Sequence, residues 1–405
     1  MEERAKKNLR LLNLLGFLSG FRAFEGVIAV YFATISGSYA AAMTVLATVN
    51  FSASFFEIPT GVFSDYIGRK KTLVLFYGAG CLGIFFYWAA SSSALLFLGA
   101  LLTGLSMALR SGTISAYVYE NLEILGKGNE FKAYEGHRQS VVRYSMVAAG
   151  IVGTPLIFFF DMRAAVLVTL AGVATAFALS FLLRDVRERG SHEANIYAHI
   201  GEAWRAFLQD PALRDISIGR IIAQGGGNLE YRFRALLFAT IMPPWLVNIV
   251  GMMNNLITGI SMKLTPRVVE RFGIMKSLVH VEIYSRLTTA VCVVANSIPA
   301  AFIMNIFTSI SFGVREIAAE DVLQSRYTKN QRATMGSLLG LSGSLLYGAL
   351  GIAAGFLADA IGVVATMLIL QPALLLSAVF FYKGIKRLGD ISPVHKDFAG
   401  SMNEE

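Results

Sequence analysis

The stretch "GVFSDYIGRKKTL", residues 61–73, is a short polar interruption between two long apolar blocks of the sequence. Two glycines flank an aspartate, and three consecutive basic residues follow the second glycine. Glycine permits a tight turn, an aspartate can accept hydrogen bonds from helix-terminal amides, and basic side chains are attracted to the anionic inner surface of a membrane. The stretch therefore predicts a tight cytoplasmic connection between two membrane-spanning helices.

The composition extends this prediction to the whole chain. Of the 405 residues, 55% are hydrophobic and 15% are charged. The apolar residues form blocks of about 20 residues, the length that a helix needs to cross a bilayer. We therefore expect an all-α membrane protein with twelve transmembrane helices. The predicted spans are 11–34, 39–62, 72–90, 94–118, 139–160, 164–184, 215–241, 245–265, 277–296, 299–322, 333–357 and 362–383.

Basic residues concentrate in alternate loops. The formal net charge is +8, and the loops that carry it alternate with short uncharged loops such as "SGSY" and "NSIP", with Arg163 as the exception. By the positive-inside rule, both termini are expected on the cytoplasmic side of the cytoplasmic (inner) membrane. The charge then reflects topology and contact with the lipid bilayer, and it requires no nucleic-acid partner.

The sequence contains an internal repeat. A shift of 205 residues, without a gap, matches charged residues and glycines of the first half with those of the second. The matched pairs are Glu25 with Glu230, Asp65 with Glu270, Gly68 with Gly273, Lys71 with Lys276, Arg110 with Arg315, and Gly150 with Gly355. The repeat predicts two six-helix halves, residues 1–184 and 214–383, related by an axis along the membrane normal. We expect residues 185–213 to be a cytoplasmic linker with an amphipathic helix and residues 384–405 to be a cytoplasmic tail.

The opening stretch resembles the loop between helices 2 and 3 of the major facilitator superfamily, in which glycine, aspartate, glycine and a basic cluster recur at fixed spacing. Further stretches similar to members of that superfamily are "PRVVERFGIMK" (266–276), "RATMGSLLG" (332–340) and "GFLADAIG" (355–362). The resemblance covers nearly the whole chain. It implies that superfamily's fold and secondary transport by alternating access. It also implies that the loop latches the two halves when the cavity opens outward; the latch residues are Gly61, Asp65, Gly68, Arg69 and Glu270.

In that superfamily, helices 1, 4, 7 and 10 line a central cavity, and the charged residues of the apolar blocks concentrate on the same four predicted helices. An ionised side chain in the bilayer costs about 2.5–3.5 kcal/mol even on the lenient insertion scale, so such groups face water or a partner. We expect four arginines to bind substrate: Arg22, Arg110, Arg232 and Arg315. Because Arg110 and Arg315 are matched by the repeat, they are expected to grip one anion from opposite halves.

The seventh predicted span contains "GGGNLEYRFR", residues 225–234. Three consecutive glycines lower helix stability, so we expect the helix to bend or unwind there and to expose backbone groups to the cavity. The alternative is a packing device, in which the glycines admit a neighbouring helix.

The charged residues also have a simpler interpretation as local ion pairs. Residues three or four positions apart lie on one helical face, so Arg22 could neutralise Glu25, and Glu230 could neutralise Arg234. For Glu282 and Arg286, on a helix expected to be peripheral, we favour such a local pair.

Guanidinium groups in a common cavity favour carboxylate or phosphate ligands, which they bind through paired hydrogen bonds. The predicted function is therefore transport of an organic anion or zwitterion, such as a polycarboxylate siderophore of the citrate type. The alternative is a proton-driven multidrug efflux antiporter for lipophilic compounds, which the 29 phenylalanines would suit. The sequence has no ATP-binding loop and no metal-ligand set, so we expect neither an enzyme nor a cofactor, and we expect a monomer.

Proton coupling needs a titratable group whose proton affinity changes with conformation. Glu25 and Glu230 are the leading candidates because they lie at repeat-matched positions of the cavity helices, and Glu57 is the third. The stretch "GIVGTP", residues 150–155, is similar to only a fragment of the glycine–proline motif of drug/proton antiporters. The sequence therefore leaves the direction of transport open.

Overall fold

The computed structural model describes residues 1–185, 207, 210–327 and 331–389, and within these residues all regular structure is helical. Ten helical segments of this part are long and apolar enough to cross a membrane. One of them, Pro244–Ala295, contains two helices, and the helix Pro211–Phe238 is not among the ten. The predicted all-α membrane fold is confirmed, and the helices are consistent with twelve crossings.

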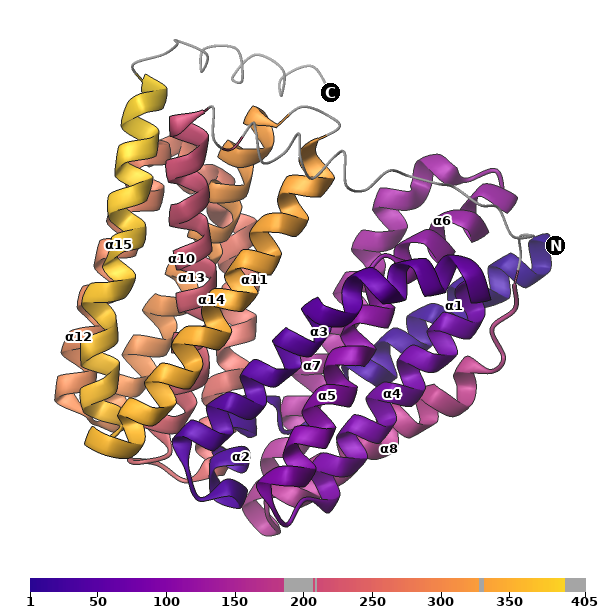
Figure 1. Ribbon diagram of the computed structural model, residues 1–405, viewed down its shortest axis with the longest axis horizontal. Helices are drawn as coiled ribbons and strands as arrows, with labels where there is room; N and C mark the ends of the chain where they lie inside the picture. The colour runs from indigo at the N-terminus through magenta and orange to yellow at the C-terminus, as the bar shows by residue number, and fades with distance from the viewer. Residues whose placement is uncertain (186–206, 208–209, 328–330, 390–405) are drawn as a thin grey trace.

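The helices form two bundles (Figure 1). We call the first the N-terminal half; its elements are α1 (Glu2–Gly20), η1 (Glu25–Val27), α2 (Ile28–Ser36), α3 (Tyr39–Ile67), α4 (Arg69–Ala89), α5 (Ser93–Arg110), α6 (Thr113–Ile124), η2 (Gly128–Glu130), α7 (Phe131–Phe159) and α8 (Met162–Ser180). The C-terminal half consists of α10 (Pro211–Phe238), α11 (Pro244–Met275), η3 (Lys276–His280), α12 (Val281–Ala295), α13 (Ile298–Arg326), α14 (Gln331–Ile361) and α15 (Val363–Gly389). Of the expected linker, 185–213, the structure describes residues 185, 207 and 210–213, and α10 already begins at Pro211. The expected amphipathic helix lies almost wholly outside the described residues, as do residues 390–405 of the expected tail, whereas 384–389 belong to α15.

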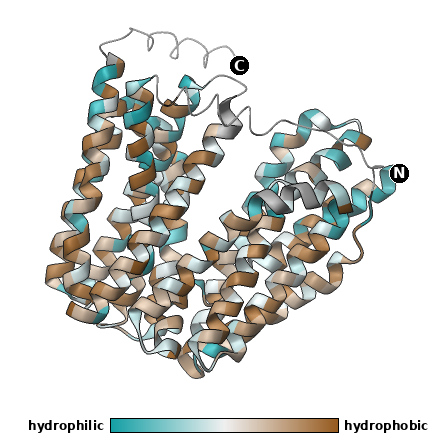
Figure 2. Cartoon of the chain, in the orientation of Figure 1, coloured by the Kyte–Doolittle hydropathy of each residue, from teal (hydrophilic) through white to brown (hydrophobic). Residues whose placement is uncertain are grey.

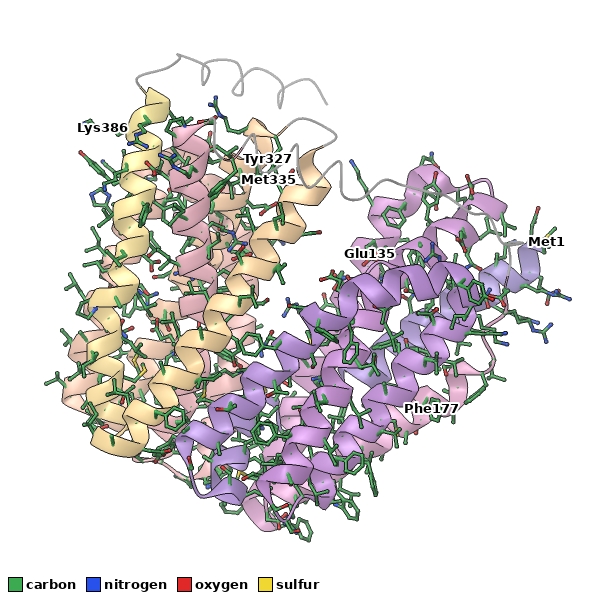
Figure 3. All side chains as sticks on the ribbon, viewed as in Figure 1. Met1, Glu135, Phe177, Tyr327, Met335 and Lys386 are labelled. Carbon is green, nitrogen blue, oxygen red and sulfur yellow. The ribbon has the colours of Figure 1, made fainter. Side chains whose placement is uncertain are left out.

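The two halves meet at one end and diverge at the other, which gives the molecule the shape of a V (Figure 1). We call these the closed end and the open end. Met1 and Lys386 both lie at the open end (Figure 3). Hydrophobic residues cover the outward faces of both bundles, and hydrophilic residues gather toward the open end (Figure 2). Large apolar side chains such as Phe159 and Phe160 are about three-quarters exposed, as expected of residues that face lipid.

The internal repeat is visible in the backbone. Gly68, between α3 and α4, has φ 91° and ψ 153°, and its repeat partner Gly273, near the end of α11, has φ 77° and ψ 159°. Residues other than glycine rarely adopt this backbone conformation. The two glycines therefore make the same kind of turn at matched positions of the two halves.

The predicted break in the seventh span is wrong, because α10 runs without interruption from Pro211 to Phe238. The glycines serve close packing instead. A methyl group on Gly225 would lie 2.8 Å from the carbonyl oxygen of Gly343, and one on Gly227 would lie 2.8 Å from the guanidinium of Arg315. The packing alternative is thus the correct one.

The first span is broken instead. Helix α1 ends at Gly20, the backbone is irregular over 21–24, and a single 3₁₀ turn at Glu25–Val27 leads into α2. The amide of Ala23, in the irregular stretch, is satisfied by the hydroxyl of Thr169 at 2.9 Å. Irregular backbone is tolerated at this depth because its polar groups find partners or face a cavity.

Polar contacts join the halves at the closed end. The carboxylate of Asp359 on α14 accepts hydrogen bonds from the hydroxyl of Ser38 at 2.6 Å and from the backbone amides of Tyr39 and Ala40 at 2.7 and 3.0 Å. Asp359 therefore caps the N-terminus of α3, a helix of the other half. A second contact between the halves is made by Gly26 and Gly251, which bring η1 and α11 close together.

We predict that Gly251→Ala separates the halves at the closed end. The added methyl would lie 2.8 Å from the Cα of Gly26, and overpacking of this kind costs about 1–3 kcal/mol. Thermal unfolding of the purified protein should show a lower Tm. The matched control is Gly259→Ala on the same helix, where no atom lies within 4 Å of the new methyl. A Gly251→Ala variant as stable as this control would contradict the packing described.

We also predict that Asp359→Ala, which removes the cap, raises the population in which the closed end opens. Loss of a helix cap costs about 0.5–2 kcal/mol. Because Asp359 and the helix that it caps belong to different halves, this loss weakens the contact between the halves. Distances between spin labels placed on the two halves at the closed end should show the shift. The control is Asp161→Ala, because Asp161 caps α8 within its own half by accepting from the amide of Ala164 at 2.9 Å. An equal shift in both variants would refute a specific role for Asp359.

Candidate functional site

A cavity of about 450 Å³ lies between the halves. Most of its lining comes from the N-terminal half, and the C-terminal half contributes Asn228, Tyr231, Arg232 and Tyr347. The volume is in the range of sites for small organic molecules, about 300–1,000 Å³. Both halves thus contribute to one site that is large enough for such a solute.

Among the residues that the structure describes, the lining contains four arginines and one carboxylate. The charged residues of the lining are Arg22, Glu25, Arg110, Arg138 and Arg232. Three of the four predicted binding arginines are therefore brought together in one cavity, and Arg138 is an additional one. Because the positive charges outnumber the negative, the cavity favours an anionic guest.

The broken first helix places two of these groups. Arg22 lies in the irregular stretch after α1, and Glu25 begins the 3₁₀ turn. The expected local pair is loose, with 3.8 Å between Arg22 Nη1 and Glu25 Oε2. The closer partner of Glu25 is Arg232 of the C-terminal half, whose Nη2 donates to Glu25 Oε1 at 2.7 Å. One carboxylate thus joins two arginines and two halves.

Arg232 is held from two further sides. Its Nη1 lies 3.5 Å from the backbone carbonyl of Glu25, and its guanidinium lies 5.3 Å from the centre of the Tyr231 ring. An arginine over an aromatic face gains a favourable electrostatic interaction. In contrast, Oε2 of Glu25 is buried without a hydrogen-bond partner among the described residues. Arg232 therefore has several partners, whereas one carboxylate oxygen of Glu25 has no hydrogen-bond partner among the described residues.

The other arginines of the cavity differ in their partners. Arg138 forms a two-pronged ion pair with Glu135, one turn before it on α7, at 2.5 and 2.8 Å. The sequence contains this spacing of three residues, so the pair could have been found as a local one. Arg110, the last residue of α5, has no hydrogen-bond or ion-pair partner in the described part of the chain. Arg22 and Arg110 are therefore the charges available to a guest.

Arg315 does not line this cavity, so the expected grip by Arg110 and Arg315 is wrong. Arg315 is 2% exposed, and its Nη1 donates to Glu282 Oε2 at 2.5 Å. Glu282 comes from α12, so the partner lies on a different helix and could not be found by searching the neighbouring positions of α13. The repeat matched the two positions but not the directions of their side chains.

Glu230 is also placed away from this cavity. It is 3% exposed, forms an ion pair with Arg286, and accepts from the hydroxyl of Thr289 at 3.0 Å. The simpler interpretation, a local pair of Glu230 with Arg234, does not hold either, since Arg234 donates to the hydroxyl of Thr308 instead.

The expected local pair of Glu282 and Arg286 is present at 3.1 Å, but it belongs to a larger set. We call this set the buried ion cluster; its members are Glu230, Glu282, Arg286 and Arg315. The hydroxyl of Ser377 on α15 also donates to Glu282 at 2.9 Å. The cluster connects α10, α12, α13 and α15 inside the C-terminal half. Its members are each at most 4% exposed. Although α12 is expected to be peripheral, its residues Glu282 and Arg286 are therefore buried and contact other helices.

The remaining predicted residues lie toward the open end. Glu57 is exposed, accepts from the hydroxyl of Ser111 at 3.0 Å, and is not part of the cavity lining. Arg69 donates to the hydroxyl of Ser64 at 2.9 Å within the N-terminal half, and Glu270 is exposed. The surroundings of Gly61 and the side chain of Asp65 lie outside the described part of the structure. The latch therefore remains a prediction, and in this state the halves are apart at the end where it would act.

No family model and no curated protein matches the sequence. Solved structures do resemble it. The nucleoside transporter NupG has a TM-score of 0.75 and 14% identity, over 94% of this chain and 99% of that one. A bacterial homologue of the human lysosomal transporter Spinster, in an inward-facing and unoccupied conformation, has a TM-score of 0.72 and 16% identity, over 94% and 95% of the two chains. A D-xylose–proton symporter has a TM-score of 0.71 and 13% identity, over 93% and 96%.

These similarities cover nearly the full length of each chain, although the sequences share few residues. The chain is thus an integral membrane protein with the fold of these transporters, the major facilitator fold that the sequence motifs imply.

Proposed function

We propose that the protein is a secondary transporter that moves an organic anion or zwitterion across the cytoplasmic membrane by alternating access, coupled to protons. The observation that carries the proposal is the lining of the cavity, in which four arginines accompany one glutamate. Intramembrane arginines that face a water-filled cavity are typical of a path for an oppositely charged solute.

The shape of the molecule supports an inward-open state. The halves diverge at the end at which Met1 and Lys386 lie (Figure 3). By the positive-inside rule, this end is the cytoplasmic one. The closed end, sealed by the Asp359 cap and the contact of Gly26 with Gly251, would then face the outside. A substrate in the cavity would have access to the cytoplasm alone.

The arrangement of charges supports a carboxylate or phosphate as the recognised group. Arg138 is neutralised by Glu135, and Arg232 by Glu25, which leaves Arg22 and Arg110 for the guest. Guanidinium groups bind such oxyanions through two parallel hydrogen bonds. A polycarboxylate, including a siderophore of the citrate type, would engage both arginines at once. A lipophilic cation would meet repulsion from them.

Glu25 is the proposed proton carrier. It lines the cavity and forms the ion pair that links the two halves, so its charge affects both substrate binding and the contact between halves. Protonation would weaken the pair with Arg232 and release that arginine for the substrate. Glu230, in contrast, is fully engaged in the buried ion cluster, away from the cavity lining.

The direct test is solute flux in proteoliposomes. A panel of carboxylates, phosphates and lipophilic cations should show uptake or efflux of anions only, and an imposed pH gradient should drive their accumulation. Transport of lipophilic cations in exchange for protons, without transport of anions, would instead identify a multidrug antiporter. The absence of flux for every solute, together with binding of one of them, would identify a receptor.

We predict that Glu25→Gln abolishes accumulation driven by the pH gradient but leaves exchange of substrate at equal pH. The amide cannot carry a proton, yet it keeps the size of the side chain. Glu57→Gln is the control, because Glu57 is exposed and not part of the lining. Loss of coupling in the Glu57 variant with retention in the Glu25 variant would reverse the assignment.

We predict that Arg110→Lys weakens anion transport, since lysine keeps the charge but loses the planar fork. A hydrogen bond to a charged group contributes about 1.5–3 kcal/mol, so KM should rise about 10- to 150-fold. The control is Arg143→Lys, on exposed surface of α7 and not part of the cavity lining. An unchanged KM for every anion of the panel in the Arg110 variant would remove this residue from the binding site.

A further inference from the structure

A second, much smaller pocket lies between the halves on the closed-end side of the large cavity. Its volume is about 20 Å³. It shares Glu25, Tyr231 and Arg232 with the large cavity and extends to Arg234 and Asn305 of the C-terminal half. About 10–15 Å³ of such volume is needed for one water molecule, so the pocket has room for one water or one monatomic ion and excludes an organic acid.

Arg234 is the unusual member of this lining. It is 7% exposed, and its one hydrogen bond among the described residues runs from Nη1 to the hydroxyl of Thr308. Its Nε is buried with no hydrogen-bond partner in the described part of the chain. A buried guanidinium with neither a carboxylate nor a full set of acceptors costs several kcal/mol, because the lost hydration is not replaced.

The neighbouring charges do not compensate Arg234. The nearest acid on its own helix, Glu230, is already bonded to Arg286 and Thr289. The buried ion cluster contains two arginines and two glutamates and is balanced by itself. On the other side of the pocket, Glu25 is paired with Arg232. Among the residues that the structure describes, one positive charge is therefore left over at the pocket.

We propose that this pocket binds a single small inorganic anion of the size of chloride, held by Arg234. The anion would supply the missing negative charge beside the guanidinium of Arg234, which lines the pocket. A water molecule could fill the volume, but it would leave the charge uncompensated. The proposal does not depend on the identity of the transported solute, because the organic anions of the large cavity do not fit here.

Binding would have a consequence for conformation. The lining includes Gly26 and Ala29 of the N-terminal half and Val247 and Gly251 of the C-terminal half, so the pocket exists only while the halves meet at the closed end. An anion that binds one conformation stabilises that conformation. Chloride should therefore stabilise the state described here against both unfolding and opening of the closed end.

The test uses the purified full-length protein in sodium gluconate, with chloride substituted for gluconate at constant ionic strength. We expect a saturable rise in Tm of a few degrees for the wild type with chloride or bromide. Arg234→Gln should abolish the rise. Arg110→Gln, which alters the large cavity alone, should retain it, and Arg143→Gln should behave as the wild type.

Three outcomes would overturn the proposal: no saturable halide response of the wild type, an unchanged response in Arg234→Gln, or loss of the response in Arg110→Gln. The first would leave water as the occupant, and the last would assign the halide to the large cavity. Should Arg234→Gln fail to fold, crystals of the wild type grown in bromide provide the decisive measurement. An anomalous peak beside Arg234 would support the proposal, and its absence would refute it.

Discussion

The ion pair of Glu25 with Arg232 connects the two halves at the point where the large cavity begins. Each group alone would be an unpaired charge within the bilayer, and the pair avoids that cost only while both halves are in place. The contact requires a carboxylate that projects from irregular backbone on one side and an arginine on a straight helix on the other. The break in the first span and the continuity of α10 are both parts of this geometry.

The two halves have diverged in how they use the same repeat. Glu25 and Glu230 occupy matched positions, yet Glu25 faces the cavity and Glu230 is locked in the buried ion cluster. Arg110 and Arg315 differ in the same way. At these matched positions, the charged side chains of the C-terminal half form ion pairs inside that half. Those of the N-terminal half line the cavity.

The sequence predicted what depends on the pattern along the chain. Blocks of apolar residues gave the spans, and the repeat gave matched positions, including the two glycines with the same turn conformation. Scarce charges in apolar spans identified Arg22, Arg110 and Arg232 as lining residues. The sequence could not predict which helix a buried charge pairs with, because Glu282 lies 33 residues before Arg315 on another helix. Nor could it decide whether three glycines break a helix or admit a neighbour, since the outcome depends on the side chain of the facing helix.

The cap that Asp359 provides has a consequence for the order of α3. Most helices are capped by a residue just before their first turn, and Ser38 does so here by accepting from the amide of Ala41 at 3.1 Å. The amides of Tyr39 and Ala40, however, depend on a carboxylate from the other half. When the closed end opens, these two amides lose their acceptor and meet water. Hydrogen exchange at these positions would thus report the conformational state of the whole molecule, with no label attached.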